Sequence, residues 1–181
     1  MVLVSVAVLL AACGSPSSDD AGAAPSKPAK RAHADDPRPE RFRIVPDDYH
    51  VPYAGTAEDG RKFFLSQELF DLRGAAYVGL FLWRADGTFD RVEVDKVARP
   101  TGVPPGQAAP AGADGLVKAR LGELGDYQRG PIEVEPFLEK VHGVDFGWHV
   151  GRYDDGEWYV NIEPGDFICY YAPWDGIGYD T

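Results

Sequence analysis

Apolar residues fall into short runs separated by Asp-Gly pairs, a pattern typical of strands joined by tight turns. The clearest run, Tyr77–Trp83, is almost wholly apolar, as expected of a strand covered on both faces. It is followed by Asp86–Gly87 and by an alternating segment, 88–94. A two-residue loop there pairs Gly79 with Val94, Phe81 with Val92, Leu80 with Glu93, Leu82 with Arg91, and Arg84 with Phe89. The first two pairs are expected on a buried face and the other three on a half-buried face.

The apolar segments 158–162 and 167–171 predict a second hairpin near the C-terminus. With Pro164–Gly165 as its loop, the facing pairs are Ile162 with Phe167, Val160 with Cys169, and Trp158 with Tyr171. All six share one face, which is the register that a buried sheet surface demands. Cys169 is then a core thiol, while Tyr159 and Tyr170 face each other on the side opposite the core.

Several other segments predict strands. The apolar pattern begins at 42–45, and two strands are expected around 53–54 and 62–65. Residues 66–70 fit either an extension of the second strand or a helical turn, and the pattern leaves both open. Segments 132–137 and 144–150 alternate, the latter with Phe146, Trp148 and Val150 on one face.

One helix is expected, at about 114–124, after a long Pro- and Gly-rich loop over 99–113. Asp114 can cap its first turn. Val117, Leu121 and Leu124 recur at the spacing of one helix face, and Gly125 is a helix-ending residue. The elements together predict an α+β fold, mainly an antiparallel sheet of about six to eight strands with this one short helix.

The first 41 residues have a different character. Val2–Ala12 is an apolar run too short to span a bilayer and ends in Leu10–Cys13, which resembles the lipobox of bacterial lipoproteins. This resemblance implies a signal peptide over 1–12, removed before Cys13, and a lipid on the Cys13 thiol. The alternatives are an ordinary secretory signal with a chance cysteine, or an N-terminal core strand. Residues 13–41 hold no aromatic residue and predict a disordered tether, which leaves 42–181 as one folded domain.

The net charge of −11 resides in that domain, since residues 42–181 carry 13 Lys and Arg against 24 Asp and Glu. A surface this acidic repels phosphate backbones, so nucleic-acid binding is not expected. The predicted partner is the membrane, through the N-terminal lipid on its extracytoplasmic side, and a protein or envelope component is left open as a second partner.

Catalytic motifs are sparse. Ser66 is the only serine after residue 41 and lacks a nucleophile-elbow sequence, which argues against a serine hydrolase. Asp145 and His149 lie on one side of a predicted strand but about 13 Å apart, too far for one ion. There is no Gly-x-Gly-x-x-Gly or phosphate-loop sequence, so no cofactor is predicted.

Ten of the 22 aromatic residues lie in 141–181. After the predicted core residues are set aside, the candidate ligand surface comprises Tyr159, Tyr170, Trp174 and Asp175. Paired aromatic rings on a sheet face can stack on sugars or peptides. The alternative is that a helix or loop covers this face as a second layer.

The closing residues carry a second resemblance. Pro173-Trp174-Asp175-Gly176 followed by Tyr179-Asp180-Thr181, together with Phe146-Gly147 and Pro164, resembles proteins called formate hydrogenlyase regulatory protein-like. The match covers about 40 C-terminal residues, and here Ile177-Gly178 separate its two halves. The resemblance supplies no catalytic residues, and its name implies a cytoplasmic regulator, which conflicts with the lipobox.

The sequence therefore favours a lipid-anchored extracytoplasmic protein with a non-catalytic binding or interaction module. One alternative is a divalent-metal-dependent enzyme that uses carboxylates of the C-terminal sheet. Another is the regulatory protein that the second resemblance implies.

Overall fold

The computed structural model describes residues 37–97 and 112–181 of the chain. The predicted signal peptide, Cys13, most of the tether and nearly all of the predicted 99–113 loop lie outside these residues. The described residues form eleven strands and one helix, which confirms the α+β class. The strand number exceeds six to eight because several strands have only two to four residues. In the described part of the chain, no helix has both the length and the apolar composition that crossing a membrane requires.

The strands form three antiparallel sheets. The five-stranded sheet has the order β5–β4–β3–β2–β6, with β2 Tyr53–Thr56, β3 Lys62–Phe70, β4 Ala76–Trp83, β5 Phe89–Val97 and β6 Gln128–Arg129. The four-stranded sheet has the order β11–β10–β9–β8, with β8 Leu138–Val141, β9 Val144–Arg152, β10 Trp158–Glu163 and β11 Cys169–Tyr170. The two-stranded sheet pairs β1 Phe42–Ile44 with β7 Ile132–Val134.

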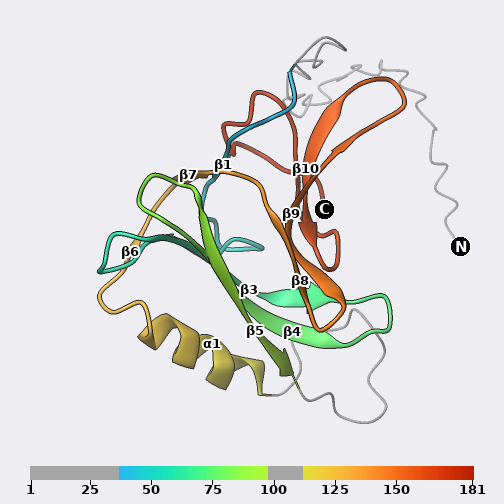
Figure 1. Ribbon diagram of the computed structural model, residues 1–181. Helices are drawn as coiled ribbons and strands as arrows, with labels where there is room; N and C mark the ends of the chain where they lie inside the picture. Colours follow the sequence, from blue (N-terminus) through green and yellow to red (C-terminus); the bar gives the residue numbers. More distant parts are fainter. Residues whose placement is uncertain (1–36, 98–111) are drawn as a thin grey trace, which may run out of the picture.

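The helix α1, Ala113–Gly122, lies along the five-stranded sheet, on the side away from β8–β10 (Figure 1). Two apolar clusters hold these layers together. The larger one joins the two main sheets and β1, and includes Phe42, Phe81 and Trp148. The smaller one joins the five-stranded sheet to α1 through Val78, Leu80, Leu82, Val117 and Leu124. The outer face of the four-stranded sheet has no helix over it among the described residues (Figure 1).

The β4–β5 hairpin has the predicted register over four pairs, from Gly79↔Val94 to Leu82↔Arg91. It departs at its turn end, where Trp83 rather than Arg84 is opposite Phe89 because an irregularity follows Leu82. The face expected to be half-buried is more enclosed, since Leu80 and Leu82 are at most 1% exposed under α1. Every residue of β4 is buried, which explains its continuous apolar sequence.

Three local predictions are decided by the structure. Residues 66–70 extend β3, with a bulge between Ser66 and Leu69. Asp114 does not cap α1: Gly112 is the N-cap, and Asp114 lies in the first turn, where its charge favours the helix N-terminus. The predicted buried stripe of the helix is confirmed, with Val117 and Leu124 buried and Leu121 partly buried.

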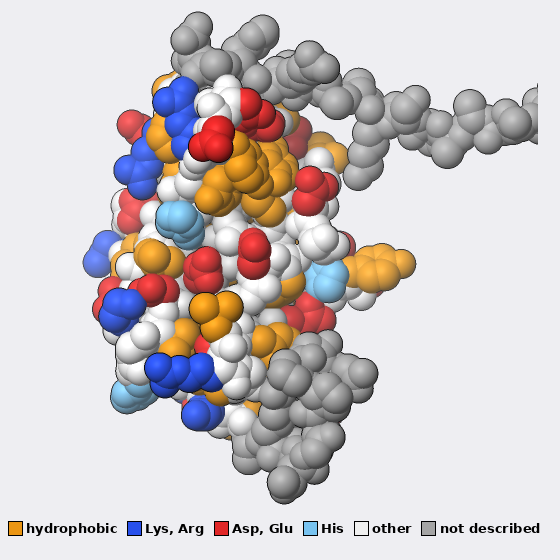
Figure 2. All heavy atoms as spheres, turned by 90° about the vertical axis from the view of Figure 1, so that its right-hand side faces the viewer, with side chains coloured by type: hydrophobic (Ala, Val, Ile, Leu, Met, Phe, Trp, Pro, Cys, Tyr) orange, Lys and Arg blue, Asp and Glu red, His pale blue; other side chains and the backbone are white. Residues whose placement is uncertain are grey.

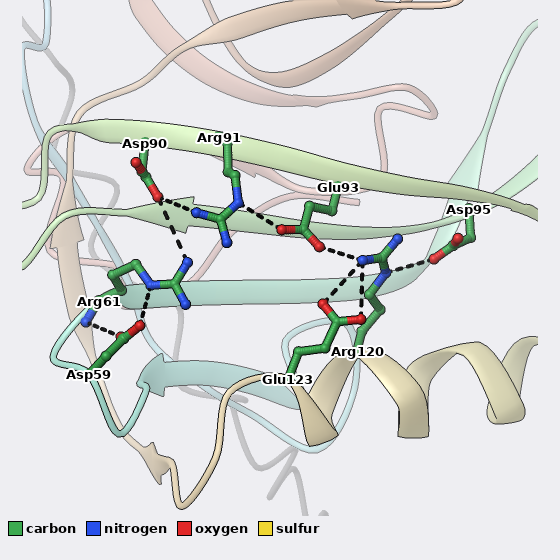
Figure 3. Close-up of polar contacts among 8 residues, drawn as sticks. All are labelled: Asp59, Arg61, Asp90, Arg91, Glu93, Asp95, Arg120 and Glu123. Carbon is green, nitrogen blue, oxygen red and sulfur yellow. Dashed lines mark hydrogen bonds and ion pairs between the residues drawn. The ribbon is translucent and has the colours of Figure 1, made fainter.

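A row of alternating acidic and arginine side chains, which we call the ladder, joins α1 to the five-stranded sheet (Figure 3). Arg120 of α1 bonds to Glu93 and Asp95 of β5, with its Nε 2.7 Å from Asp95, and also to Glu123. The ladder continues across the sheet through Arg91, Asp90, Arg61 and Asp59. Burial alone would raise the pKa of Glu93, but its bond from Arg91 and the charge of Arg120 hold it below its ordinary value.

Candidate functional site

The β10–β11 pairing differs by one residue from the predicted register. Val160 is opposite Tyr170, and Asn161 is opposite Cys169. The connection is longer than the predicted two-residue loop, because Ile162 N donates to Ile168 O and both Gly165 and Asp166 adopt positive φ. The prediction that Tyr159 and Tyr170 face each other on the outer face is therefore wrong.

Tyr170 belongs to the core. Its side chain is 1% exposed, and its ring centroid lies 5.6 Å from that of Phe42 and 5.7 Å from that of Trp148. Its hydroxyl has no hydrogen-bond partner among the described residues. Burial raises the pKa of Tyr170 far above its ordinary value. Tyr170 is thus removed from the candidate ligand surface.

The outer face instead carries Tyr153, Tyr159 and Tyr171, which we call the tyrosine cluster. The Tyr153 ring lies 4.6 Å from that of Tyr159 and 6.4 Å from that of Tyr171, and the Tyr153 and Tyr171 hydroxyls are 3.1 Å apart. Tyr153 is 46% exposed. Sequence reasoning missed Tyr153, which directly follows β9. It placed Tyr171 in the core because the one-residue shift exchanges the two faces of β11.

Cys169 lies beside this cluster and is 9% exposed. Burial raises the pKa of its thiol, although side-chain hydrogen bonds to Tyr171 and Tyr153 act in the opposite direction. A thiol held in its neutral form is a poor nucleophile. Cys169 is buried, as predicted, but the predicted core face is wrong: it pairs with Asn161 rather than Val160 and so lies on the outer face with Tyr171.

Gly151 shapes the cluster from beneath. It is opposite Tyr159 in the β9–β10 pair, and a Cβ atom on it would lie 2.0 Å from Cζ and 2.1 Å from Oη of that tyrosine. The Tyr159 ring therefore lies directly over the glycine, an arrangement in which the ring covers backbone that a glycine leaves bare.

Gly151→Ala is expected to displace the Tyr159 ring with little loss of stability. The atoms that would clash are at the far end of a side chain, so the ring moves while the backbone pairing stays. We expect the ring signals of Tyr159 and Tyr153 to shift in a ¹³C NMR spectrum, with a stability change below about 1 kcal/mol. Gly130→Ala is the control, because a Cβ atom there meets nothing within 4 Å. Unchanged tyrosine signals in the Gly151 variant would contradict the arrangement.

Acidic side chains lie on the same face as the cluster. Figure 2 shows a hydrophobic patch with Asp and Glu side chains below it. Glu163 and Asn161 of β10 share the outer face with His149 of β9, since Asn161 is opposite His149. Burial raises the pKa of Glu163, and the nearby charges of Asp166 and Asp145 add to this.

Trp174 and Asp175 have a different location and role. The Trp174 carbonyl accepts a hydrogen bond from Arg43 N of β1, and its side chain packs against the larger core cluster. Asp175 accepts a bond from Ile177 N in its own turn. Gly176 has φ of 73°, and a Cβ atom there would lie 2.5 Å from the Arg43 carbonyl oxygen. The Pro-Trp-Asp-Gly segment thus packs its turn against β1, and no ring contact among the described residues joins Trp174 to the tyrosine cluster.

Two side-chain pairs, each with one carboxylate, lie where β3 meets the C-terminal segment. His50 Nδ1 is 2.5 Å from Glu68 Oε2, and the Tyr179 hydroxyl donates to Asp47 at 2.5 Å. A histidine held by a carboxylate can serve as a base if a nucleophile lies next to it. The nearby hydroxyl of Ser66 is 3% exposed and accepts a bond from Glu68 N instead. These contacts hold the C-terminal segment against Asp47, His50 and β3, and they do not assemble a hydrolase site.

The carboxylates do not group into a metal site. Within residues 37–97 and 112–181, no three His, Cys, Asp or Glu side chains are arranged to hold an ion. Comparison with protein-family models, with curated proteins and with solved structures finds no match to the chain.

Proposed function

We propose that the protein is a lipid-anchored extracytoplasmic protein whose domain is a non-catalytic binding module. The observation that carries this proposal is the tyrosine cluster, three rings on a sheet face that α1 does not cover. Tyrosines supply large contact area at low conformational cost and a hydroxyl for hydrogen bonding. The ligand surface is the outer face of the four-stranded sheet, centred on Tyr153 and Tyr159.

The lipobox-like sequence Leu10–Cys13 supports the anchor. Two or more acyl chains on an N-terminal cysteine give stable attachment to the extracytoplasmic side of the cell membrane, where one chain is marginal. The resemblance to formate hydrogenlyase regulatory protein-like sequences remains a prediction. Its residues Trp174 and Gly176 have structural roles in the turn against β1, which do not depend on a regulatory function.

Cys13→Ala is expected to abolish lipid attachment completely, because the thiol is the acylated group. Cells fed an alkyne-labelled palmitate analogue should label the unchanged chain and not the variant. The variant should also leave the membrane fraction. Cys169→Ala is the matched control, since this buried thiol lies in the folded domain. Labelling that persists in Cys13→Ala, or soluble unchanged chain in the cytosol, would favour the regulator alternative.

The ligand surface has its own test. The full chain, with ¹³C-labelled tyrosines, is titrated with soluble cell-wall fragments and with peptides from the envelope. We expect Tyr153 and Tyr159 signals to shift while buried Tyr170 stays unchanged. Tyr153→Ala should weaken the interaction at least tenfold, whereas Tyr49→Ala, also an exposed tyrosine at 82%, should not. Equal effects of the two variants would overturn the assignment of the surface.

A divalent-metal enzyme is not favoured by the geometry of the described carboxylates. Chelator is expected to leave the melting temperature of the domain unchanged. A drop in melting temperature on addition of chelator, reversed by a divalent ion, would return the enzyme alternative to consideration.

A further inference from the structure

A pocket of about 810 Å³ opens at one end of the outer face of the four-stranded sheet. Its volume is within the size range of small-molecule sites. It lies between the turn after β3, the β8–β9 turn and the loop after β10. Its walls are partly apolar, formed by Phe70, Val144 and Pro164. Leu72, which is fully exposed, lies among its lining residues.

The four carboxylates that line the pocket differ in how many hydrogen-bond and ion-pair partners they have. Asp71 accepts hydrogen bonds from two backbone N–H groups and from the Tyr77 hydroxyl. Asp145 forms an ion pair with Lys140 at 2.6 Å. The side-chain carboxylates of Glu163 and Asp166 have no hydrogen bond or ion pair with any described residue, although Glu163 is partly buried. The pocket therefore presents two carboxylates that have no side-chain partner within residues 37–97 and 112–181.

Among the described residues, the other titratable groups in the lining are Arg73 and His142, both exposed. Carboxylates outnumber arginine and lysine there by four to one. Burial and the charges of Asp166 and Asp145 disfavour the ionised form of Glu163, and only the His149 charge opposes this. An ionised carboxylate in these surroundings lowers the stability of the folded protein unless a positively charged group binds next to it.

A second acceptor without a partner lies on the same face of β10. Asn161 is 7% exposed, and its Oδ1 bonds to no described residue. It precedes Glu163 by two residues, so the two side chains point to the same side of the sheet. A ligand rich in hydrogen-bond donors that extends along β10 from the pocket would satisfy this acceptor as well.

These groups select an organic cation over a metal ion. A metal ion needs several ligands at about 2.0–2.6 Å, and the described residues offer no such group of three. An ammonium group has three N–H donors and no acceptor, which matches a pocket whose free groups are acceptors. The apolar walls suit a methylene chain that carries such a group.

We propose that this pocket binds a primary ammonium group on a methylene chain, as in a lysine-type side chain. Glu163 and Asp166 accept its hydrogen bonds, and Phe70, Val144 and Pro164 pack against the chain. The inference rests on the proposed binding function, since it names the ligand chemistry at one end of the same sheet face.

The test uses the full chain in detergent micelles, titrated by calorimetry at neutral pH and low salt. The probe is Nα-acetyl-lysine methylamide, and its matched control is the norleucine analogue, which has the methylene chain but no ammonium group. We expect the lysine compound to bind at least tenfold more tightly. Glu163→Gln should weaken it at least tenfold, while Glu157→Gln, in the turn at the other end of β10, should leave its affinity within twofold.

Free cadaverine and calcium chloride are the two further arms. Cadaverine that binds as tightly as the lysine compound supports the ammonium chemistry and assigns a free diamine as its source. Equal binding of the lysine and norleucine compounds, an unaffected Glu163→Gln variant, or binding of calcium alone would overturn the proposal.

Folding of the variant is checked in the same samples. Since the pKa of Glu163 is raised in the folded protein, its stability contribution is present below the ordinary pKa of 4.5 and is lost as pH rises. Glu163→Gln should therefore melt at a higher temperature than the unchanged chain at neutral pH, with the gain vanishing below about pH 4.5. The tyrosine surface is tested separately by Tyr153→Ala, so failure of one site leaves the other assignment standing.

Discussion

Arg120→Ala is expected to lower the melting temperature of the domain by roughly 5–10 °C, which corresponds to about 2 kcal/mol. The reason is that Arg120 joins Glu93, Asp95 and Glu123, and its removal leaves three carboxylates close together with only Arg91, among the described residues, still bonded to Glu93 (Figure 3). The side chains of Arg120, Glu93 and Asp95 are 18%, 22% and 29% exposed. The effect therefore lies between that of a surface pair and that of a fully buried one.

The pH dependence separates charge from packing in this variant. The pKa of Glu93 is lowered in the folded protein, so its contribution is present above its ordinary value of 4.5 and is lost as pH falls. The difference between Arg120→Ala and the unchanged chain should shrink below about pH 4.5. Lys118→Ala, an exposed position on the same helix, should change stability by less than about 0.5 kcal/mol. A deficit independent of pH would show that the arginine acts through packing alone.

Alkaline unfolding is the second large effect expected. Burial raises the pKa of five tyrosines in the folded protein, namely Tyr77, Tyr159, Tyr170, Tyr171 and Tyr179. A group with a raised pKa contributes stability that is present below its ordinary value and lost as pH rises above it. At pH 11, about one unit above the ordinary value, Tyr170 alone costs about 1.4 kcal/mol. Stability should fall steeply above pH 10, with tyrosinate absorbance rising in step with loss of the fold.

Tyr170→Phe tests both this effect and the β10–β11 register. Its hydroxyl is buried and bonds to no described residue, so removing it should stabilise the domain by about 1 kcal/mol at neutral pH. The alkaline transition should also move to higher pH. Tyr49→Phe, at an exposed position, is the control and should change neither quantity. A neutral result for Tyr170→Phe would favour the register that places Tyr170 outside.

Much of the fold could be predicted from local patterns. The apolar run of β4 indicated a strand buried on both faces, and it lies between the two apolar clusters. Asp86–Gly87 set a tight turn, which is why four cross-strand pairs of the β4–β5 hairpin were predictable. The spacing of Val117, Leu121 and Leu124 located the buried face of α1. Each of these signals depends on residues close together in the chain.

The candidate site was only partly predictable. Tyr159 was identified, but Tyr153 was overlooked and Tyr170 was placed on the wrong face. The role of Trp174 depends on its contact with Arg43, a residue 131 positions earlier, which no local pattern reveals. The pocket likewise joins three turns from distant parts of the sequence, around Arg73, Gly143 and Gly165.

The aromatic C-terminal end shows where sequence and tertiary structure each decide. The sequence by itself determined that 158–162 and 167–171 are apolar segments of one hairpin and that this end of the chain belongs to the core. It did not determine the face that each ring occupies, because both alternating sets of the last strand are apolar or aromatic. Phe167, Cys169 and Tyr171 satisfy a buried face as well as Ile168 and Tyr170 do. Only the tertiary structure decided between them: the longer loop at Gly165–Asp166 and the packing of Tyr170 on Phe42 and Trp148 bury one set and leave Tyr171 beside Tyr153 on the outer face.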